Sequence, residues 1–220
     1  IIPFLPALFK KNPDTSLKDR RITVPTSSIS GFFSHSAKTY IYDWLLQSFY
    51  IYENDKLETI RHFATSEIAT EIKDGGEGFF FFVTDTGEIQ KRNKGGTFGI
   101  ISSTKTAQRP TDLCFDGMYV WILEGNTLTK ALNDDKLSPI SSYSLPYRDI
   151  RYIACEGYDM YYYTDSKIYH SSTDNPGITD KNIISPDKKI ISFDYKNKKI
   201  RYIYQEGINS YYDEIEILSK

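Results

Sequence analysis

The chain has 220 residues, enough for one domain to bury most of its surface without metal or disulfide support. Its 27 basic and 29 acidic side chains nearly cancel, so no overall field favours a nucleic acid or an anionic membrane. Aromatic residues make up 15% of the chain, which is typical of a mostly β protein. We therefore expect an all-β domain, no nucleic-acid partner, and any charged partner bound by a local patch.

The N-terminal segment, IIPFLPALF, is apolar but too short to cross a bilayer, and it contains Pro3 and Pro6. Because the sequence starts at Ile1 rather than Met, we interpret residues 1–20 as an arm or as the stub of a removed export signal. We expect an extracytoplasmic protein: periplasmic, cell-surface or secreted. No other segment approaches transmembrane length, so no integral membrane segment is expected.

An aromatic segment recurs along most of the remaining chain. Phe81, Trp121, Tyr162 and Tyr202 are separated by 40, 41 and 40 positions. A period of that size, filled with short strand-like runs, is typical of a β-propeller in which each repeat folds as one four-stranded blade. The sequence therefore predicts an all-β propeller of about five four-stranded blades, forming a single domain over residues 21–220.

The first repeat fits this spacing in two ways. If residues 48–52 (SFYIY) are its second strand, the following turn matches the next repeat, but the interval is only 31 or 32 residues. If Tyr40–Tyr42 is the second strand, the period is kept and the turn does not match. Residues 65–73 (TSEIATEIK) are also compatible with a short helix. We expect a truncated or irregular first blade.

The third and fourth repeats are predicted to be antiparallel meanders with glycine-containing turns at Asp116-Gly117 and Glu156-Gly157. The strands of the third repeat are expected at residues 112–115, 119–123, 127–132 and 140–145. Those of the fourth are expected at residues 150–154, 160–163, 167–171 and near 183–184.

The last repeat contains only three predicted strands, at residues 190–195, 200–204 and 211–218. An open seam would leave unpaired strand edges that invite association. We therefore expect Arg21–Val24, from the other end of the chain, to supply the fourth strand and close the ring.

The two cysteines, Cys114 and Cys155, are one repeat apart and so occupy nearly equivalent positions in adjacent repeats. They could be close enough to bridge, but two cysteines do not make a disulfide framework. We favour the alternative, in which both are small buried side chains.

A hairpin in the fourth repeat contains Ser172-x-Asp174-x-x-Gly177-x-Thr179, and residues 94–98 (KGGTF) keep part of this pattern in the second repeat. The pattern resembles a loosened Asp-box, the hairpin signature of bacterial sialidase-like repeat propellers. The resemblance implies a propeller fold, with Ser172 and Asp174 in a structural turn. The arginine cluster, Tyr-Glu pair and acidic proton donor of sialidases do not map onto this chain, so no catalytic residue is predicted.

Residues 115–121 (FDGMYVW) also look like the recurring DG-x-x-V-W strand pair of streptogramin-lyase-like propellers. The catalytic histidine of that lyase has no counterpart, because His35, His62 and His170 lie in other contexts. The sequence contains no phosphate-binding glycine loop, HExxH, C-x-x-C or G-x-S-x-G motif. We expect no cofactor and no metal site.

Connections from the outermost strand of one blade to the innermost strand of the next line the mouth of a propeller, where ligands usually bind. Three such connections carry the basic and aromatic residues Arg109, Tyr147, Arg148, Arg151, Tyr152, Lys188 and Lys189. Guanidinium groups pair bidentately with oxyanions, and tyrosine rings pack on sugar or aliphatic faces. These residues predict a mouth-face site for an anionic group, although independent solvated charges would give the same pattern.

We therefore predict a non-catalytic binding or scaffold propeller of a bacterial cell envelope or a phage, which recognises a protein or an acidic glycan at its mouth face. The alternative is a small glycosidase-type carbohydrate-active enzyme. It would need two carboxylates about 5–9 Å apart across a cleft. Asp116, Asp159 and Asp194 come from comparable hairpins that are expected to point away from the mouth, which disfavours the enzyme.

Overall fold

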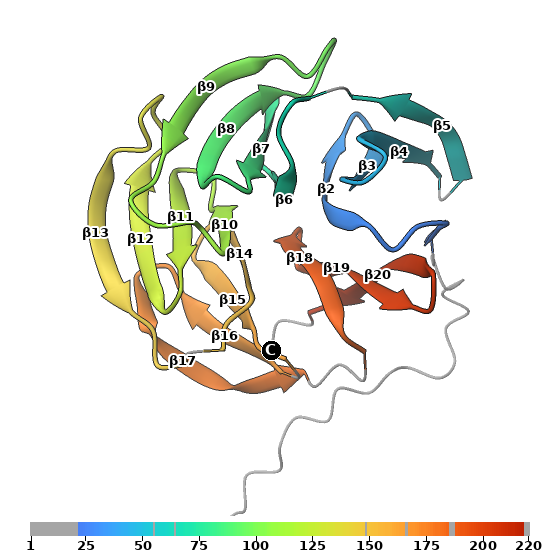
Figure 1. The fold of residues 1–220 in the computed structure, drawn as a ribbon. Helices are drawn as coiled ribbons and strands as arrows, with labels where there is room; N and C mark the ends of the chain where they lie inside the picture. Colours follow the sequence, from blue (N-terminus) through green and yellow to red (C-terminus); the bar gives the residue numbers. More distant parts are fainter. Residues whose placement is uncertain are drawn as a thin grey trace, which may run out of the picture.

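The computed structural model of the protein describes residues 22–54, 56–63, 65–147, 149–165, 167–184 and 188–217. Within these ranges the regular elements are all β-strands, and they stand radially around a central axis (Figure 1). Three sheets contain four strands each, and an eight-stranded sheet consists of two four-stranded meanders joined by one parallel pair, Gly31 with Ile72. This arrangement confirms the predicted all-β propeller.

We number the four-stranded groups as blades in the order of their inner strands. Blade 1 contains β2 (Ile29–His35), β3 (Lys38–Asp43), β4 (Ser48–Glu53) and β5 (Lys56–His62). Blade 2 contains β6 (Ala69–Asp74), β7 (Phe79–Thr84), β8 (Glu88–Asn93) and β9 (Ile100–Lys105). Blade 3 contains β10 (Asp112–Phe115), β11 (Tyr119–Glu124), β12 (Thr127–Leu132) and β13 (Pro139–Ser144). Blade 4 contains β14 (Tyr152–Glu156), β15 (Asp159–Tyr163), β16 (Ile168–Ser172) and β17 (Asn175–Ile184).

Blade 5 combines the two ends of the described chain. Its strands are β18 (Ile190–Lys196), β19 (Lys199–Glu206), β20 (Asn209–Glu216) and β1 (Ile22–Val24). β1 pairs antiparallel with β20, from Ile22 opposite Tyr212 to Val24 opposite Ser210. The predicted closure by the N-terminal strand is therefore confirmed for Ile22–Val24, whereas Arg21 and residues 1–20 lie outside the described residues.

Blade 1 differs from its prediction. Tyr40–Tyr42 lies in the second strand, so the assignment that keeps the forty-residue period is right, and residues 48–52 belong to the third strand. The blade has four strands, so the expected truncation is wrong. The turn before β3 is formed by Ser36 and Ala37, which adopt positive φ angles of 49° and 61° without the usual Asn or Gly. The sequence therefore carries no turn signal at this point.

The short helix considered for residues 65–73 is also wrong. Residues 69–73 lie in β6, the inner strand of blade 2, where Ile72 is fully buried. A Cβ atom on Gly31 of β2 would lie only 2.2 Å from the carbonyl oxygen of Ile72, so the two inner strands approach closely at the axis. Tertiary packing thus overrides a local pattern compatible with a helix.

The core consists of aromatic layers between neighbouring blades. Phe80, Phe81, Phe82 and Val83 of β7 are all fully buried, as expected for a strand covered on both faces. Between blades 1 and 2, the rings of Phe33 and Phe80 stack with centroids 4.4 Å apart. This packing makes the large aromatic content of the chain a structural requirement of the ring.

Cys114 and Cys155 form a disulfide bond with a Cα–Cα distance of 5.7 Å. The preference for two unbridged side chains is therefore wrong. The two cysteines come from β10 and β14, the inner strands of adjacent blades, which converge toward the axis. Equivalent positions in neighbouring repeats are brought within bonding distance there.

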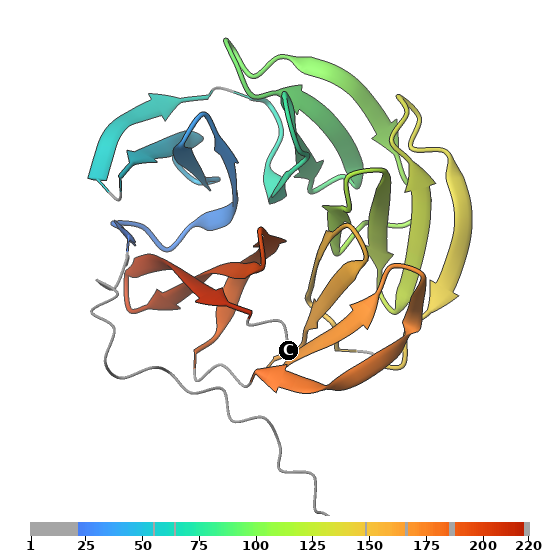
Figure 2. The same ribbon diagram turned by 180° about the vertical axis from the view of Figure 1, so that it is seen from behind.

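The ring has two faces. The mouth face carries the turns between the second and third strands of each blade and the connections between blades. Hydrogen bonds link these turns to the connections: Trp44 N, for example, donates to Ser28 O at 2.9 Å. The opposite face carries the other hairpins, where Gly157 N donates to Asp116 O at 2.7 Å. Figures 1 and 2 show the ring from its two sides. None of the described residues forms a helix capable of spanning a membrane.

Candidate functional site

The first predicted mouth residue, Arg109, lies in the connection from blade 2 to blade 3. Its side chain is exposed, and its Cα lies 3.4 Å from the position that a Cβ on Gly87 would take. Gly87 has a φ of 83° and sits in the turn between β7 and β8, so the backbone of Arg109 rests on that turn. Arg109 makes no ion pair with any described residue, and its guanidinium is available at the surface.

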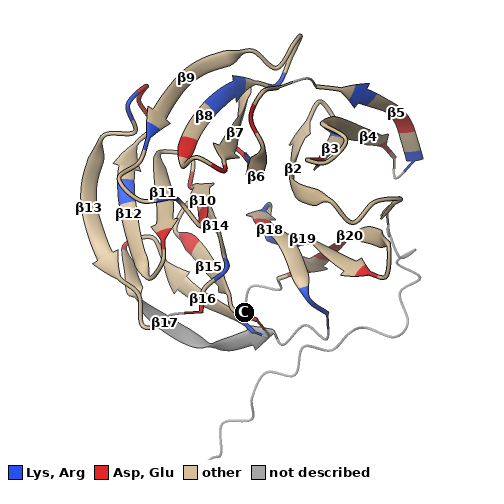
Figure 3. Ribbon diagram, in the orientation of Figure 1, with Lys and Arg blue, Asp and Glu red and all other residues tan. Residues whose placement is uncertain are grey.

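Two other predicted cations are paired with carboxylates of the same face. Arg151 contacts Asp165, in the turn between β15 and β16. Lys188 lies 3.0 Å from Glu206, at the end of β19, and 4.0 Å above the ring of Tyr204. Figure 3 shows basic and acidic residues mixed around the ring. The mouth is therefore closer to neutral than its basic residues alone predict.

The two predicted tyrosines lie in different environments, and Arg148 is outside the described residues. Tyr147 stacks on Tyr169 of β16 with centroids 4.5 Å apart. Tyr152 opens the inner strand β14, stacks on Tyr163 and lies with its ring 5.5 Å from Lys73 Nζ. Burial, and then the nearby Glu71 and Asp112, raise the pKa of Tyr152. The predicted residues thus make separate local contacts instead of one visible cluster.

Beneath the mouth, the axis of the ring is filled by the side chain of Lys73. This lysine projects from β6 of blade 2 and is only 3% exposed. Its ammonium lies 3.0 Å from Asp112 Oδ2 of blade 3 and donates to the carbonyl oxygen of Phe193 in blade 5. It also lies 3.5 Å from the carbonyl oxygen of Ile153 in blade 4. One side chain therefore ties four inner strands together.

A second carboxylate completes this arrangement, which we call the axial cluster: Glu71, Lys73, Asp112 and Ser192. Glu71 Oε1 lies 4.0 Å from Lys73 Nζ and accepts a hydrogen bond from Ser192 Oγ at 3.3 Å. Burial raises the pKa of both Glu71 and Asp112, although Lys73 opposes the shift. Burial alone would lower the pKa of Lys73, but Asp112, Glu71 and Asp194 outweigh it and raise that pKa. The cluster therefore combines one buried ammonium with two carboxyl groups whose pKa values burial raises.

A further ionic layer lies toward the opposite face. Asp74 accepts hydrogen bonds from Lys94 and Lys196, and Asp194 pairs with Arg201. Burial alone would raise the pKa of Asp74, but the neighbouring cations outweigh it and lower that pKa. A cavity of about 100 Å³ opens below this layer, lined by residues that include Asp74, Phe115, Asp116, Glu156, Asp194 and Lys196. No group of described His, Cys, Asp or Glu side chains is suited to hold a metal ion.

The three hairpin carboxylates considered for a glycosidase have structural partners. Asp116 accepts hydrogen bonds from its own turn and from Trp121 Nε1, the latter at 2.7 Å. Asp159 lies 2.9 Å from His170 Nε2, and Asp194 pairs with Arg201. These contacts give each of the three carboxylates a partner within the fold, and Asp116 and Asp194 also line the cavity of about 100 Å³.

An apolar turn on the mouth face was not singled out by the sequence. Trp44, Leu45 and Leu46 connect β3 to β4 and are 39%, 64% and 55% exposed. The carboxylate of Asp43, itself fully buried, accepts hydrogen bonds from the backbone of Leu45 and Leu46 at 2.9 Å. The turn is therefore held in one conformation with its apolar side chains in solvent.

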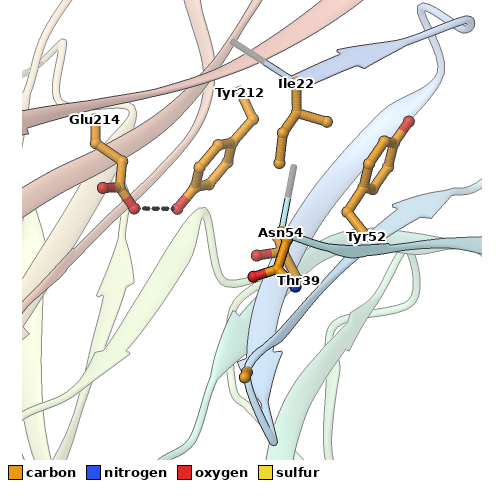
Figure 4. A pocket seen from close by; sticks show the side chains of 7 residues that line it. Ile22, Thr39, Tyr52, Asn54, Tyr212 and Glu214 are labelled. Atoms are coloured by element: carbon orange, nitrogen blue, oxygen red, sulfur yellow. Dashed lines mark hydrogen bonds between the residues drawn. The ribbon is translucent and has the colours of Figure 1, made fainter. Parts of the chain in front are cut away.

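A pocket of about 140 Å³ lies at the seam between blades 5 and 1. One wall is formed by Ile22 of β1 with Tyr212 and Glu214 of β20, and the other by Thr39, Tyr52 and Asn54 of blade 1 (Figure 4). Tyr52 donates from its hydroxyl to the carbonyl oxygen of Thr23 at 2.9 Å, which links blade 1 to the closing strand. We call this cavity the seam pocket.

Comparison with known proteins shows the fold and not a family. No protein family model and no curated protein matches the sequence. The structure is similar to the glutaminyl cyclase of Myxococcus xanthus, with a TM-score of 0.65 and 12% identity over 88% of this chain and 95% of that chain. It is also similar to streptogramin B lyase, with a TM-score of 0.54 and 12% identity over 87% of this chain and 67% of that one. The WD40 domain of Neurospora crassa Pan2 gives a TM-score of 0.50 and 10% identity over 87% of this chain and 64% of that one. At these identities the chain is similar to these proteins in its β-propeller fold alone.

Proposed function

We propose that the protein is a non-catalytic, protein-binding propeller whose partner docks on the mouth face. The observation that carries this proposal is the exposed turn Trp44–Leu46. The corresponding turns of the other four blades have the sequences DTG (85–87), GN (125–126), TDSK (164–167) and GI (207–208). Three of these turns contain only polar residues or glycine, and the fourth contains a single apolar residue, Ile208. The fold itself therefore does not need three large apolar side chains here.

Two other exposed apolar residues lie on the same face. Ile208, in the turn of blade 5, is 81% exposed, and Ile68, in the connection to blade 2, is 45% exposed. A run of exposed large apolar side chains such as Trp44, Leu45 and Leu46 is typical of a protein interface. Tryptophan in a rigid setting is a frequent energetic anchor of such interfaces. We therefore assign the main contact to blades 1 and 5.

The predicted cations give the proposal a second part. Arg109 is exposed and has no described ionic partner, so it is suited to bind a carboxylate of the docked protein. Arg148, Arg151, Lys188, Tyr147 and Tyr152 remain predicted contributors from the neighbouring connections. An acidic glycan is the alternative ligand for these residues, but it would not account for the apolar turn.

The disulfide supports an extracytoplasmic location, because such bonds form and persist mainly in oxidising compartments. A bacterial cell envelope, a secreted protein or a phage particle would each provide this setting. The Asp-box likeness contributes only a structural turn, in which Asp174 N donates to Ser172 Oγ at 3.1 Å.

The test is cross-linking and co-purification from the organism that encodes the chain. We expect the unaltered protein to capture one partner. A Leu45→Asp/Leu46→Asp variant should capture at least tenfold less of it, and the loss for Arg109→Ala should be smaller. The matched control is Leu57→Asp/Ile60→Asp, on the exposed outer strand β5. Equal loss in the control would refute the assignment. Turnover of fluorogenic glycosides would support the alternative that the protein is a glycosidase-type enzyme. Binding to an acidic glycan array that depends on Arg109 would support the acidic glycan as the ligand.

A further inference from the structure

The disulfide bond between blades 3 and 4 is buried, but a cavity reaches one of its two cysteines. Cys114 and Cys155 are each only 3% exposed, and they join the inner strands β10 and β14, which lie side by side near the axis (Figure 1). Cys155 also lines the cavity of about 100 Å³, which we call the opposite-face cavity, whereas Cys114 is not among its described lining residues. A small molecule in this cavity therefore meets one end of the bond and not the other.

The wall of the opposite-face cavity is predominantly acidic. It carries four carboxylates and one ammonium group, those of Asp74, Asp116, Glu156, Asp194 and Lys196. Asp74 is paired with Lys94 and Lys196, and Asp194 is paired with Arg201. The other two carboxylates therefore decide the sign of the charge beside the disulfide.

Asp116 and Glu156 have no cationic partner within the described part of the chain. Asp116, two residues after Cys114, accepts hydrogen bonds from two backbone N–H groups and one indole N–H. Glu156 directly follows Cys155 and accepts from Asn197 N at 2.6 Å. Because all of these donors are neutral, two uncompensated negative charges lie on the wall beside the bond. Their potential attracts a cation into the cavity and repels an anion.

We propose that Cys155 is a modification site, at which a small thiol that carries a positive charge forms a mixed disulfide through the opposite-face cavity. The thiolate of the incoming molecule attacks Sγ of Cys155, and a new S–S bond forms as the bond to Cys114 breaks. The electron pair of the broken bond leaves on Sγ of Cys114, which takes a proton from water. The exchange needs no reactant other than the thiol.

The cavity suits an aminothiol in size and in charge. An accessible volume of about 10–15 Å³ is enough for one water molecule, so a cavity of about 100 Å³ has room for a short carbon chain that ends in an ammonium group. The rings of Phe115 and Tyr195 lie in the wall and offer aromatic surface to such a chain and its cation. The ammonium group of the adduct is then held beside the carboxylates of Asp116 and Glu156.

The exchange is expected to loosen blades 3 and 4 locally and to leave the ring closed. Gly157 N donates to Asp116 O at 2.7 Å and Ile153 N donates to Asp112 Oδ2 at 2.7 Å, so two further bonds link these blades. The reacting sulfur lies toward the opposite face, away from the turn Trp44–Leu46. The proposal therefore goes beyond the proposed function and does not depend on it.

The first experiment uses the unaltered protein and three thiols of similar size: aminoethanethiol, mercaptoethanol and mercaptoethanesulfonate. Each rate of exchange is expressed per thiolate and divided by the rate of the same thiol with an uncharged small disulfide. We expect the cationic thiol to react at least about fivefold faster than the anionic one at low salt, and the difference to shrink in high salt. Peptide mapping by mass spectrometry should place the adduct on Cys155. Equal corrected rates, or an adduct mainly on Cys114, would overturn the proposal.

The variant Glu156→Gln tests the origin of the charge preference. Glutamine keeps an oxygen that accepts from Asn197 N and removes the charge, so the ratio of the cationic to the anionic rate should fall by at least about twofold. The matched control is Glu58→Gln on β5, which should leave the ratio unchanged. An unchanged ratio in Glu156→Gln, or an equal change in the control, would contradict the role of the cavity.

The second experiment compares the two cysteines one at a time. In Cys114→Ser the free thiol of Cys155 should react with a cationic methanethiosulfonate several times faster than the free thiol of Cys114 does in Cys155→Ser. Circular dichroism identifies conditions in which each variant is folded. Equal labelling of the two folded variants would contradict access through Cys155. If either variant does not fold, the mapping of the adduct on the unaltered protein decides between the two cysteines.

Discussion

The axis and the mouth face use the same charged residue types in opposite ways. At the axis, Lys73 is almost completely buried and contacts groups from three other blades. On the mouth face, Lys188 is partly exposed and pairs with one carboxylate of its own blade, Glu206. Removing a buried partner leaves an uncompensated charge, whereas an exposed pair is weakened by water and salt. The axial charge therefore connects the inner strands of four blades, whereas Lys188 makes a local pair at the surface of the mouth face.

Substitution of the axial lysine gives the largest expected effect. Lys73→Met should destabilise the protein by about 3–5 kcal/mol, because the charge of buried Asp112 loses its counter-ion. Lys188→Met, the matched change on the mouth face, should cost less than about 1 kcal/mol. Urea unfolding of both variants measures the difference. Similar losses would show that the two regions do not differ as described.

Removal of the disulfide beside the axis should have a comparable or slightly smaller effect. The bond closes a separation of 41 residues, for which loop entropy gives about 3–4 kcal/mol. We expect Cys114→Ser/Cys155→Ser to unfold at lower urea concentration and to become insensitive to reductant. If reductant does not change the urea unfolding of the unaltered protein under the same conditions, the disulfide bond is contradicted.

The pH dependence of stability sharpens the comparison further. Burial raises the pKa of Glu71 well above its ordinary value and that of Asp112 to about 6. A carboxyl whose pKa is higher in the folded protein than in the unfolded protein favours folding at low pH. This contribution to stability is complete below the unfolded-state pKa of about 4, and it is lost as the pH rises through the folded-state pKa. The free energy of unfolding should therefore fall from pH 5 to pH 8. Each extra proton bound by the folded state lowers it by at most on the order of 1 kcal/mol per pH unit.

The variant Glu71→Gln isolates this contribution, because glutamine imitates the protonated carboxyl. We expect it to unfold at a higher temperature than the unaltered protein at pH 8 and to show a shallower pH dependence. Glu77→Gln, on the exposed loop after β6, serves as the control and should leave the slope unchanged. An unchanged slope in Glu71→Gln would mean that the axial cluster does not take up a proton on folding.

The smallest expected effect on stability comes from the apolar turn. Leu45→Asp should change the unfolding free energy by no more than about 0.5 kcal/mol, because the side chain is largely exposed. The same change is expected to weaken partner binding, so stability and binding are measured on one sample. A drop of several degrees in the unfolding midpoint would show that the turn is part of the fold rather than a docking surface.

The sequence predicted the ring well where its repeats carry local signals. The aromatic second strands and the Asp-Gly and Glu-Gly turns placed the strands of blade 3 and the first three strands of blade 4 to within a few residues, and the missing fourth strand indicated the closure. The last strand of blade 4, expected near residues 183–184, begins much earlier, at Asn175. The prediction failed at Ser36 and Ala37, where the tertiary structure supports a left-handed turn without the usual residue types. The sequence also predicted cations in the connections between blades. It could not show that Asp165 pairs with Arg151 or that Glu206 pairs with Lys188, because both carboxylates come from other turns.

Local periodicity by itself determined that this chain is an all-β ring of repeated antiparallel units, because strand length, alternation and turn chemistry act over a few residues. Only the tertiary structure decided which residues meet at the centre. Glu71 and Lys73 on β6, Asp112 on β10 and Ser192 on β18 are brought together because inner strands from separate repeats converge on one axis. The same convergence joins Cys114 to Cys155. No spacing within a single repeat encodes these contacts, since each depends on the closure of the ring.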